Sequence, residues 1–130
     1  MPIDITYHED RLYIEGHYYG DVVLDDILQF NLAILDIFAK TSHKKIHLLV
    51  DVKDAKMMPV SVVRAWQIAM KAARHDKLGT VVVVGMTNPF VKFLIETLAK
   101  LGRNDLRPVS SREKAYEILE KLKDTQNNSV

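Results

Sequence analysis

The 130-residue sequence contains no cysteine. Disulfides, thiolate nucleophiles and thiolate metal ligands are therefore excluded, and a chain without cysteine fits the reducing cytoplasm. No apolar run approaches the roughly 18 to 20 residues of a membrane span, and the first residues lack the basic and apolar regions of a signal peptide. We therefore expect a soluble cytoplasmic protein with no membrane span.

An excess of charge of either sign is also missing. Eighteen basic residues balance seventeen acidic ones, which leaves a formal net charge of +1. Such a chain has no global field that would attract nucleic acid, so we expect no nucleic-acid partner. Hydrophobic residues make up 48% of the sequence, and no repeat or linker divides it, so one domain with one core is expected.

The clearest structural signal lies between residues 46 and 84. Residues 46–52 are almost continuously apolar, which is typical of a parallel strand covered on both faces. Pro59 suits the first turn of a helix, so a helix is predicted to begin at residues 59–61. The four valines at 81–84 predict a second central strand. The strand at 46–52, the helix and the strand at 81–84 together form a right-handed βαβ unit.

The flanking patterns complete an α/β domain. Alternating residues predict two half-exposed antiparallel strands before residue 20, and a capping aspartate, Asp25 or Asp26, begins a helix over 25–40. The predicted order is ββαβαβαβα: a mixed sheet of about five strands, with an antiparallel N-terminal strand and parallel later strands, packed against four helices. The domain should span 1–123, and residues 124–130 should form a disordered tail.

Helix 25–40 is apolar over more than one face. One sheet cannot bury that whole circumference. Two interpretations stay open: part of the helix pairs with another chain, as in a homodimer, or the helix lies deep in its own core.

Two helix boundaries carry specific signals. Asn88 and Pro89 suit the N-cap and first position of a helix that Gly102 would end in the left-handed conformation. Ser110 and Glu113 match the capping-box pattern of a last helix.

Ligands and partners of open α/β sheets gather beyond the carboxyl ends of the parallel strands. We call this part of the predicted molecule the carboxyl edge. Met57 and Met58 beside a proline offer adaptable apolar contact to a partner, or else they fill gaps under the turn. The candidate partner-binding residues at the carboxyl edge are Asp51, Asp54, Met57, Met58, Pro59, Val60, Ser61, Arg64, Asn88 and Pro89.

Catalytic and metal-binding patterns are missing as well. At the carboxyl edge the exposed carboxylates have no paired base, and no Ser-His neighbours occur in the same turn there, so we predict no enzyme and no catalytic residues. His43 and His47 lie in a loop and a strand without a third ligand, which argues against a metal. Gly85 lacks the second glycine and the lysine of a phosphate loop. No cofactor is expected.

The order of elements and several local patterns resemble the STAS domain, the fold of anti-sigma factor antagonists related to sporulation stage II protein AA and of the cytoplasmic tails of sulfate transporters. The matching pieces are residues 49–52, the helix entry at 58–61, residues 81–85 and the helix start at 110–115. The similarity covers nearly the whole chain. It implies a non-enzymatic, regulatory protein-interaction module.

In that family the corresponding helix entry usually carries an Asp-Ser pair, and a partner kinase phosphorylates the serine. Alignment on Met58 places Pro59 and Val60 at these positions, so the usual phosphoacceptor is missing. Ser61 could replace it if the register slips, and Arg64 would then favour the phosphate. Otherwise Ser61 is an ordinary serine at a helix start.

Two functions of different classes remain after this comparison. The first is binding of a protein partner through the carboxyl edge. The alternative is binding of a small ligand, a nucleotide or a lipid. Its pocket would lie between the sheet on one side and two helices on the other, helix 25–40 and the helix predicted to begin at residues 59–61.

Overall fold

The computed structural model describes residues 3–57, 62–87, 89–102 and 104–128. The expected order of strands and helices is confirmed. In chain order the elements are β1 (Ile3–His8), a 3-10 turn (Glu9–Arg11), β2 (Tyr13–Asp21), α1 (Leu24–Lys40), β3 (Ile46–Met57), α2 (Val62–Ala73), β4 (Leu78–Val84), α3 (Pro89–Gly102), β5 (Leu106–Val109) and α4 (Arg112–Asn128).

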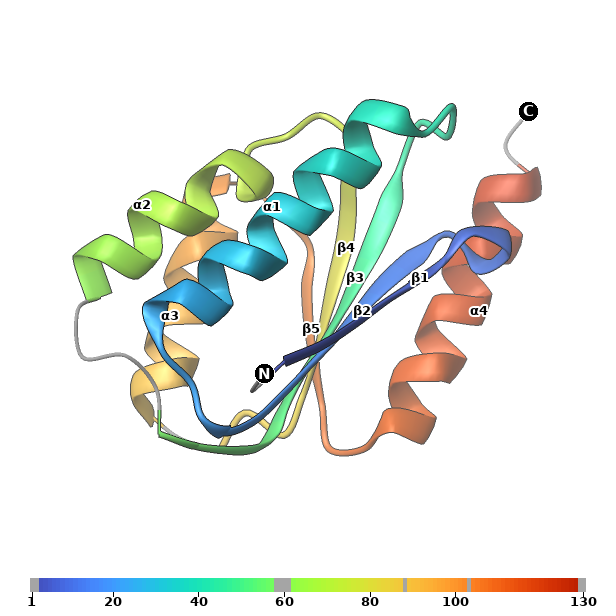
Figure 1. The fold of residues 1–130 in the computed structure, drawn as a ribbon. Helices are drawn as coiled ribbons and strands as arrows, with labels where there is room; N and C mark the ends of the chain where they lie inside the picture. Colours follow the sequence, from blue (N-terminus) through green and yellow to red (C-terminus); the bar gives the residue numbers. More distant parts are fainter. Residues whose placement is uncertain (1–2, 58–61, 88, 103, 129–130) are drawn as a thin grey trace.

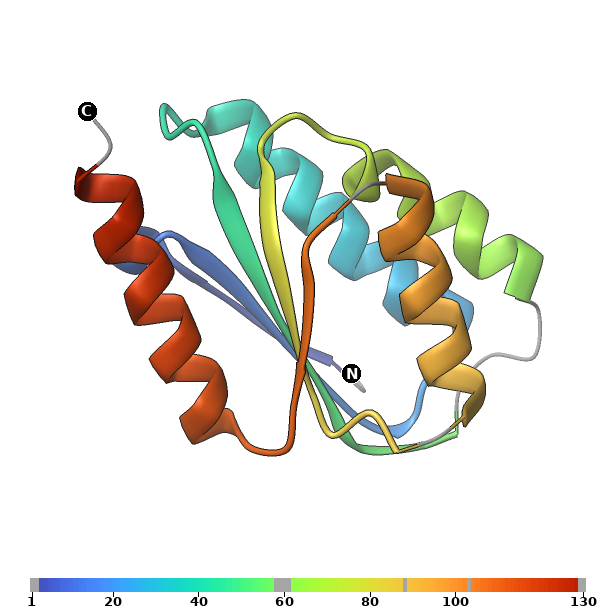
Figure 2. The ribbon, with the colours of Figure 1, turned by 180° about the vertical axis from the view of Figure 1, so that it is seen from behind.

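The five strands form one sheet in the order β1-β2-β3-β4-β5. β1 is antiparallel to β2, and the other three pairings are parallel, so the predicted mixed sheet is confirmed. Helices α1, α2 and α3 cover one face, and α4 alone covers the other (Figures 1 and 2). The tetravaline strand β4 lies between β3 and β5, as its fully apolar sequence predicts.

Strand β2 is more buried than its alternating sequence predicts. It lies inside the sheet, between β1 and β3, and its side chains Tyr13, Ile14 and Tyr18 are all buried. Gly16 in this strand is needed because an added Cβ would lie 2.5 Å from the Phe30 ring of α1. The absence of a side chain at Gly16 therefore lets α1 pack closely on the sheet.

Strand β3 extends beyond the predicted end at residue 52 and reaches Met57. Its polar second half pairs with the end of β2, where Tyr19 lies opposite Asp54 and Asp21 opposite Met57. Residues 53–57 are therefore part of the strand. Backbone pairing with a neighbouring strand stabilises this extension without an apolar side-chain pattern.

Most of the apolar surface of α1 is buried within the chain. Ile27, Phe30, Ile34 and Phe38 all belong to the core cluster on the three-helix face. Leu32 is the exception, with 51% of its surface exposed. Burial of α1 in the core of its own chain therefore accounts for most of its apolar residues. The exposed Leu32 is left for the other interpretation, contact with another chain.

The helix ends differ in detail from the predicted caps. Asp26 is not the cap: it lies in the first turn of α1, and its carboxylate accepts a hydrogen bond of 2.8 Å from the Val23 N–H. Gly102 is the last helical residue of α3 and has no positive φ, so the left-handed ending was wrong. Ser111, rather than Ser110, accepts a hydrogen bond from the Lys114 N–H at the start of α4.

The predicted disordered tail begins too early, because α4 continues through residues 124–128 to Asn128. These residues have no apolar stripe to bury, which is why the pattern indicated a tail. A helix that is already nucleated extends by one backbone hydrogen bond per residue, so extension does not require burial.

Candidate functional site

The carboxyl ends of β2, β3, β4 and β5 lie at one edge of the sheet, which is the lower edge in Figure 1. At this edge Asp54 is exposed in β3, Arg64 is exposed in the first turn of α2, and Pro89 is exposed at the start of α3. Met57 ends β3. Five predicted site residues lie outside the described residues: Met58, Pro59, Val60, Ser61 and Asn88.

Asp51 differs from the other predicted site residues, because only 1% of its surface is exposed. Its carboxylate accepts a hydrogen bond of 2.7 Å from Arg112 Nε and one of 3.0 Å from the Lys53 N–H. Arg112 is the first residue of α4, and its Nη1 also lies 3.4 Å from a carboxylate oxygen of Glu15 in β2. Asp51 therefore joins a partly buried ion cluster that fixes the start of α4 to two strands.

Three aromatic side chains, His8, Tyr13 and Tyr116, adjoin this ion cluster. His8 Nε2 lies 3.3 Å from the other oxygen of Glu15, and the His8 ring stacks on Tyr13 with centroids 4.5 Å apart. Burial, with the nearby negative charge of Glu15, raises the pKa of Tyr13 to about 12. Burial and Glu15 likewise raise the pKa of Tyr116 in α4. Both phenols are therefore neutral at physiological pH and act as uncharged packing groups.

Asp54 forms a second, separate contact, a hydrogen bond with His17. His17 Nε2 donates to Asp54 Oδ2 over 2.8 Å, across the point where the pairing of β2 and β3 shifts register. This hydrogen bond, helped by the charge of Lys53, lowers the pKa of Asp54 below its ordinary value of 3.8. The pair orients the Asp54 carboxylate at the carboxyl edge.

The pKa of the Asp54 carboxyl is lower in the folded protein than in the unfolded chain, so the ionised carboxylate stabilises the fold at pH values above the unfolded-state pKa. That stabilisation is lost as the pH falls through the folded-state pKa. In a carboxyl-carbon NMR titration we expect an Asp54 midpoint below 3.8, moving back toward 3.8 in a His17→Ala variant. His8→Ala is the control, since His8 contacts Glu15 and not Asp54. A wild-type midpoint at or above 3.8 would contradict the pairing.

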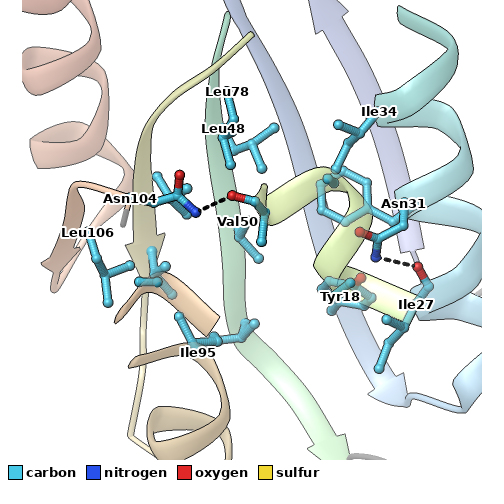
Figure 3. Close-up of a pocket in the computed structure, with 18 residues that line it drawn as sticks. Tyr18, Ile27, Asn31, Ile34, Leu48, Val50, Leu78, Ile95, Asn104 and Leu106 are labelled. Atoms are coloured by element: carbon cyan, nitrogen blue, oxygen red, sulfur yellow. Dashed lines mark hydrogen bonds between the residues drawn. The ribbon is translucent and has the colours of Figure 1, made fainter. Parts of the chain in front are cut away.

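The three-helix face holds an apolar cavity of about 140 Å³ between the sheet and helices α1, α2 and α3. Among the described residues, the polar part of the lining comes from Tyr18, Asn31 and Asn104. The side-chain amides of the two asparagines are held by hydrogen bonds to backbone carbonyl groups. Asn31 Nδ2 donates to Ile27 O over 2.8 Å, and Asn104 Nδ2 donates to Ala73 O over 2.7 Å (Figure 3). The apolar lining residues are Ile27, Phe30, Ile34, Leu48, Val50, Val52, Ala69, Ala72, Ala73, Leu78, Val81, Val83, Ile95, Ala99 and Leu106.

A cavity of 140 Å³ is large for a domain of this size, and it is partly open to solvent. Protein interiors are close-packed, and voids larger than a water molecule are few. A molecule bound here would remove apolar lining surface from water, at roughly 25 cal/mol per Å², so the cavity is a candidate ligand site.

The sequence did not reveal the ion cluster or the cavity walls. Arg112 and Asp51 are 61 positions apart, and no local pattern links them. The cavity does lie where the predicted pocket was placed, against α1 and α2, although its wall also includes residues of α3 and β5. Alternation along β2 could have placed Glu15 on the same face as Tyr13, which is the face that α4 covers.

Two further findings bear on possible functions. Among the described residues, no group of three or more histidine or acidic side chains is arranged to hold a metal ion. In the same part of the chain, no helix is both long and apolar enough to cross a membrane.

The sheet order, the antiparallel first strand and the single helix behind the sheet define an α/β fold with one mixed five-stranded sheet. Solved structures share this fold. An uncharacterized protein from Shewanella loihica PV-4, described as a DUF3478 family member with a SpoIIAA-like fold, matches with a TM-score of 0.65 and 14% identity over 90% of this chain and 91% of that chain.

The unphosphorylated form of the anti-sigma factor antagonist SpoIIAA matches with a TM-score of 0.64 and 9% identity, over 90% of this chain and 96% of that chain. No family model and no curated protein matches the sequence. The chain thus has a SpoIIAA-like fold, as the sequence resemblance implied.

Proposed function

We propose that this protein is a non-enzymatic, STAS-like regulatory module that acts in the cytoplasm and binds a protein partner through the carboxyl edge. The observation that supports this proposal best is the shared fold with SpoIIAA, an anti-sigma factor antagonist. Two exposed groups of opposite charge, Asp54 and Arg64, also lie at that edge. Met57, Met58, Pro59, Val60, Ser61, Asn88 and Pro89 complete the proposed surface, and Asp51 would support it from beneath.

Charge reversal at Arg64 tests this proposal. We expect Arg64→Glu to reduce at least tenfold the recovery of a specific partner in affinity capture from the native host, because a partner group that accepts the guanidinium would then face a carboxylate. Lys71→Glu is the matched control: it reverses an exposed charge on the same helix, two turns further from the carboxyl edge. Circular dichroism should show both variants folded.

Partner recovery that is the same for wild type, Arg64→Glu and Lys71→Glu would count against the carboxyl edge as the binding surface. A sizing measurement on the purified protein tests the separate proposal of a homodimer through α1, whose exposed Leu32 would be covered in a dimer. Phosphorylation of Ser61 stays a prediction, which mass spectrometry of protein from the host would check.

A second candidate function is favoured by the apolar cavity: binding of a small ligand between the sheet and the three helices. The two functions are compatible, because the cavity and the carboxyl edge are formed by different parts of the same elements.

A further inference from the structure

We propose that the cavity under α1, α2 and α3 binds a compact, neutral, apolar molecule of about six to eight non-hydrogen atoms, such as a single aromatic ring. This inference rests on the second candidate function above and names its ligand class. It is independent of whether the carboxyl edge binds a protein.

The size of the cavity sets the upper limit on the ligand. An engineered cavity of about 150 Å³ lined by aliphatic and aromatic side chains stays dry and binds benzene. The cavity of this protein has nearly the same volume, about 140 Å³, and the same kind of wall. Pockets for drug-sized ligands measure roughly 300 to 1,000 Å³, so this cavity is too small to enclose a nucleotide or a long acyl chain.

The chemistry of the wall excludes charged ligands of the same size. Among the lining residues that the structure describes, Tyr18 alone is ionisable, and burial raises its pKa, so it is neutral. A carboxylate or phosphate placed here would meet no compensating charge, and burial of an unpaired charge is strongly unfavourable. The ligand should therefore be uncharged, unlike a nucleotide or an ionised fatty acid.

The two asparagines give the cavity fixed walls at opposite sides (Figure 3). Asn31 is held to its own helix, whereas Asn104, ahead of β5, ties its side chain to the end of α2 at Ala73 O. The Asn104 N–H also donates to Ala99 O in α3 over 2.8 Å. These bonds tie α2, α3 and the approach to β5 together beside the cavity.

The test is a benzene titration of the full chain, followed by methyl NMR and by thermal unfolding. Methyl groups of Ile34, Leu48 and Val83, which line the cavity, should shift in a saturable manner, and those of exposed Leu32 should not. The thermal midpoint should rise by about 2 to 5 °C near saturation. Benzoate, decanoate and ATP at the same concentrations should cause neither change.

Cavity-filling variants locate the site. Ala69→Leu in α2 and Ala99→Leu in α3 add bulk to the wall from two different helices, and each should weaken benzene binding at least tenfold while keeping or raising the thermal midpoint. Ala39→Leu on the exposed side of α1 is the matched control and should bind benzene like the wild type. Two filling variants are used so that the test survives if one of them packs badly.

The inference is overturned if benzene leaves the cavity methyl groups unchanged, if both filling variants bind benzene as well as Ala39→Leu, or if benzoate, decanoate or ATP shifts the same methyl groups. None of these outcomes affects the Arg64→Glu capture experiment, which uses protein without added ligand. Failure of the cavity proposal and failure of the proposed partner binding are therefore distinguishable.

Discussion

An Arg112→Ala protein should lose about 3 kcal/mol of its free energy of unfolding, because the change leaves the buried Asp51 carboxylate without its charged partner. Asp51 is 1% exposed and receives the Arg112 Nε hydrogen bond at 2.7 Å. The Lys53 N–H is the other donor to this carboxylate, and one backbone donor does not compensate a buried charge. Urea denaturation should show a lower midpoint with an unchanged slope.

Arg107→Ala provides the matched control for this experiment. Arg107 also pairs through Nε with an aspartate, Asp105, at 3.0 Å, but both side chains are about half exposed. An exposed pair of this kind contributes roughly 0 to 1 kcal/mol, so its loss should be small. If the Arg107 and Arg112 variants lost equal stability, burial of Asp51 would not be the cause.

A double change refines the interpretation. Asp51→Asn combined with Arg112→Ala removes both charges, and it should cost less than the sum of the two single changes, because neither charge is left buried alone. The difference measures how strongly the pair couples α4 to β3. This coupling matters for the proposed function, because β3 leads directly into the carboxyl edge.

The sheet could be predicted from the sequence because its central strands carry a strong local signal. Residues 46–52 and 81–84 are apolar on both faces, and only interior strands of a covered sheet have that pattern. Parallel pairing follows from the helix between them. The second half of β3 carries no such signal, since its polar residues are held by pairing with the end of β2.

Helix ends and the candidate site were harder to predict, for different reasons. A boundary depends on one or two weak hydrogen bonds, so neighbouring residues such as Ser110 and Ser111 compete for the same cap. The ion cluster depends on contacts between residues far apart in sequence, such as Asp51 and Arg112. The cavity depends on how far α2 and α3 stand from the sheet, a distance that hydrophobic periodicity does not encode.

A Gly85→Ala protein should also lose about 3 kcal/mol, from two causes that act at one residue. Gly85 follows β4 at the carboxyl edge with a φ of +75°, a conformation that costs an alanine roughly 1 to 2 kcal/mol. An added Cβ would also lie 2.5 Å from the Lys53 Cβ and 2.7 Å from its Cα in β3. Relief of that contact requires movement of a strand backbone, which adds about 1 to 3 kcal/mol.

Gly20→Ala separates these two causes in a parallel urea denaturation experiment. Gly20 has a similar φ of +65°, but an added Cβ there meets no atom within 4 Å. The Gly20→Ala protein should therefore lose only the free energy that the left-handed backbone conformation costs an alanine, about 1 kcal/mol. Equal losses at the two glycines would mean that β3 and the end of β4 do not approach closely at Gly85. The carboxyl edge depends on that approach, because it brings the exits of both strands to one surface that a partner can contact.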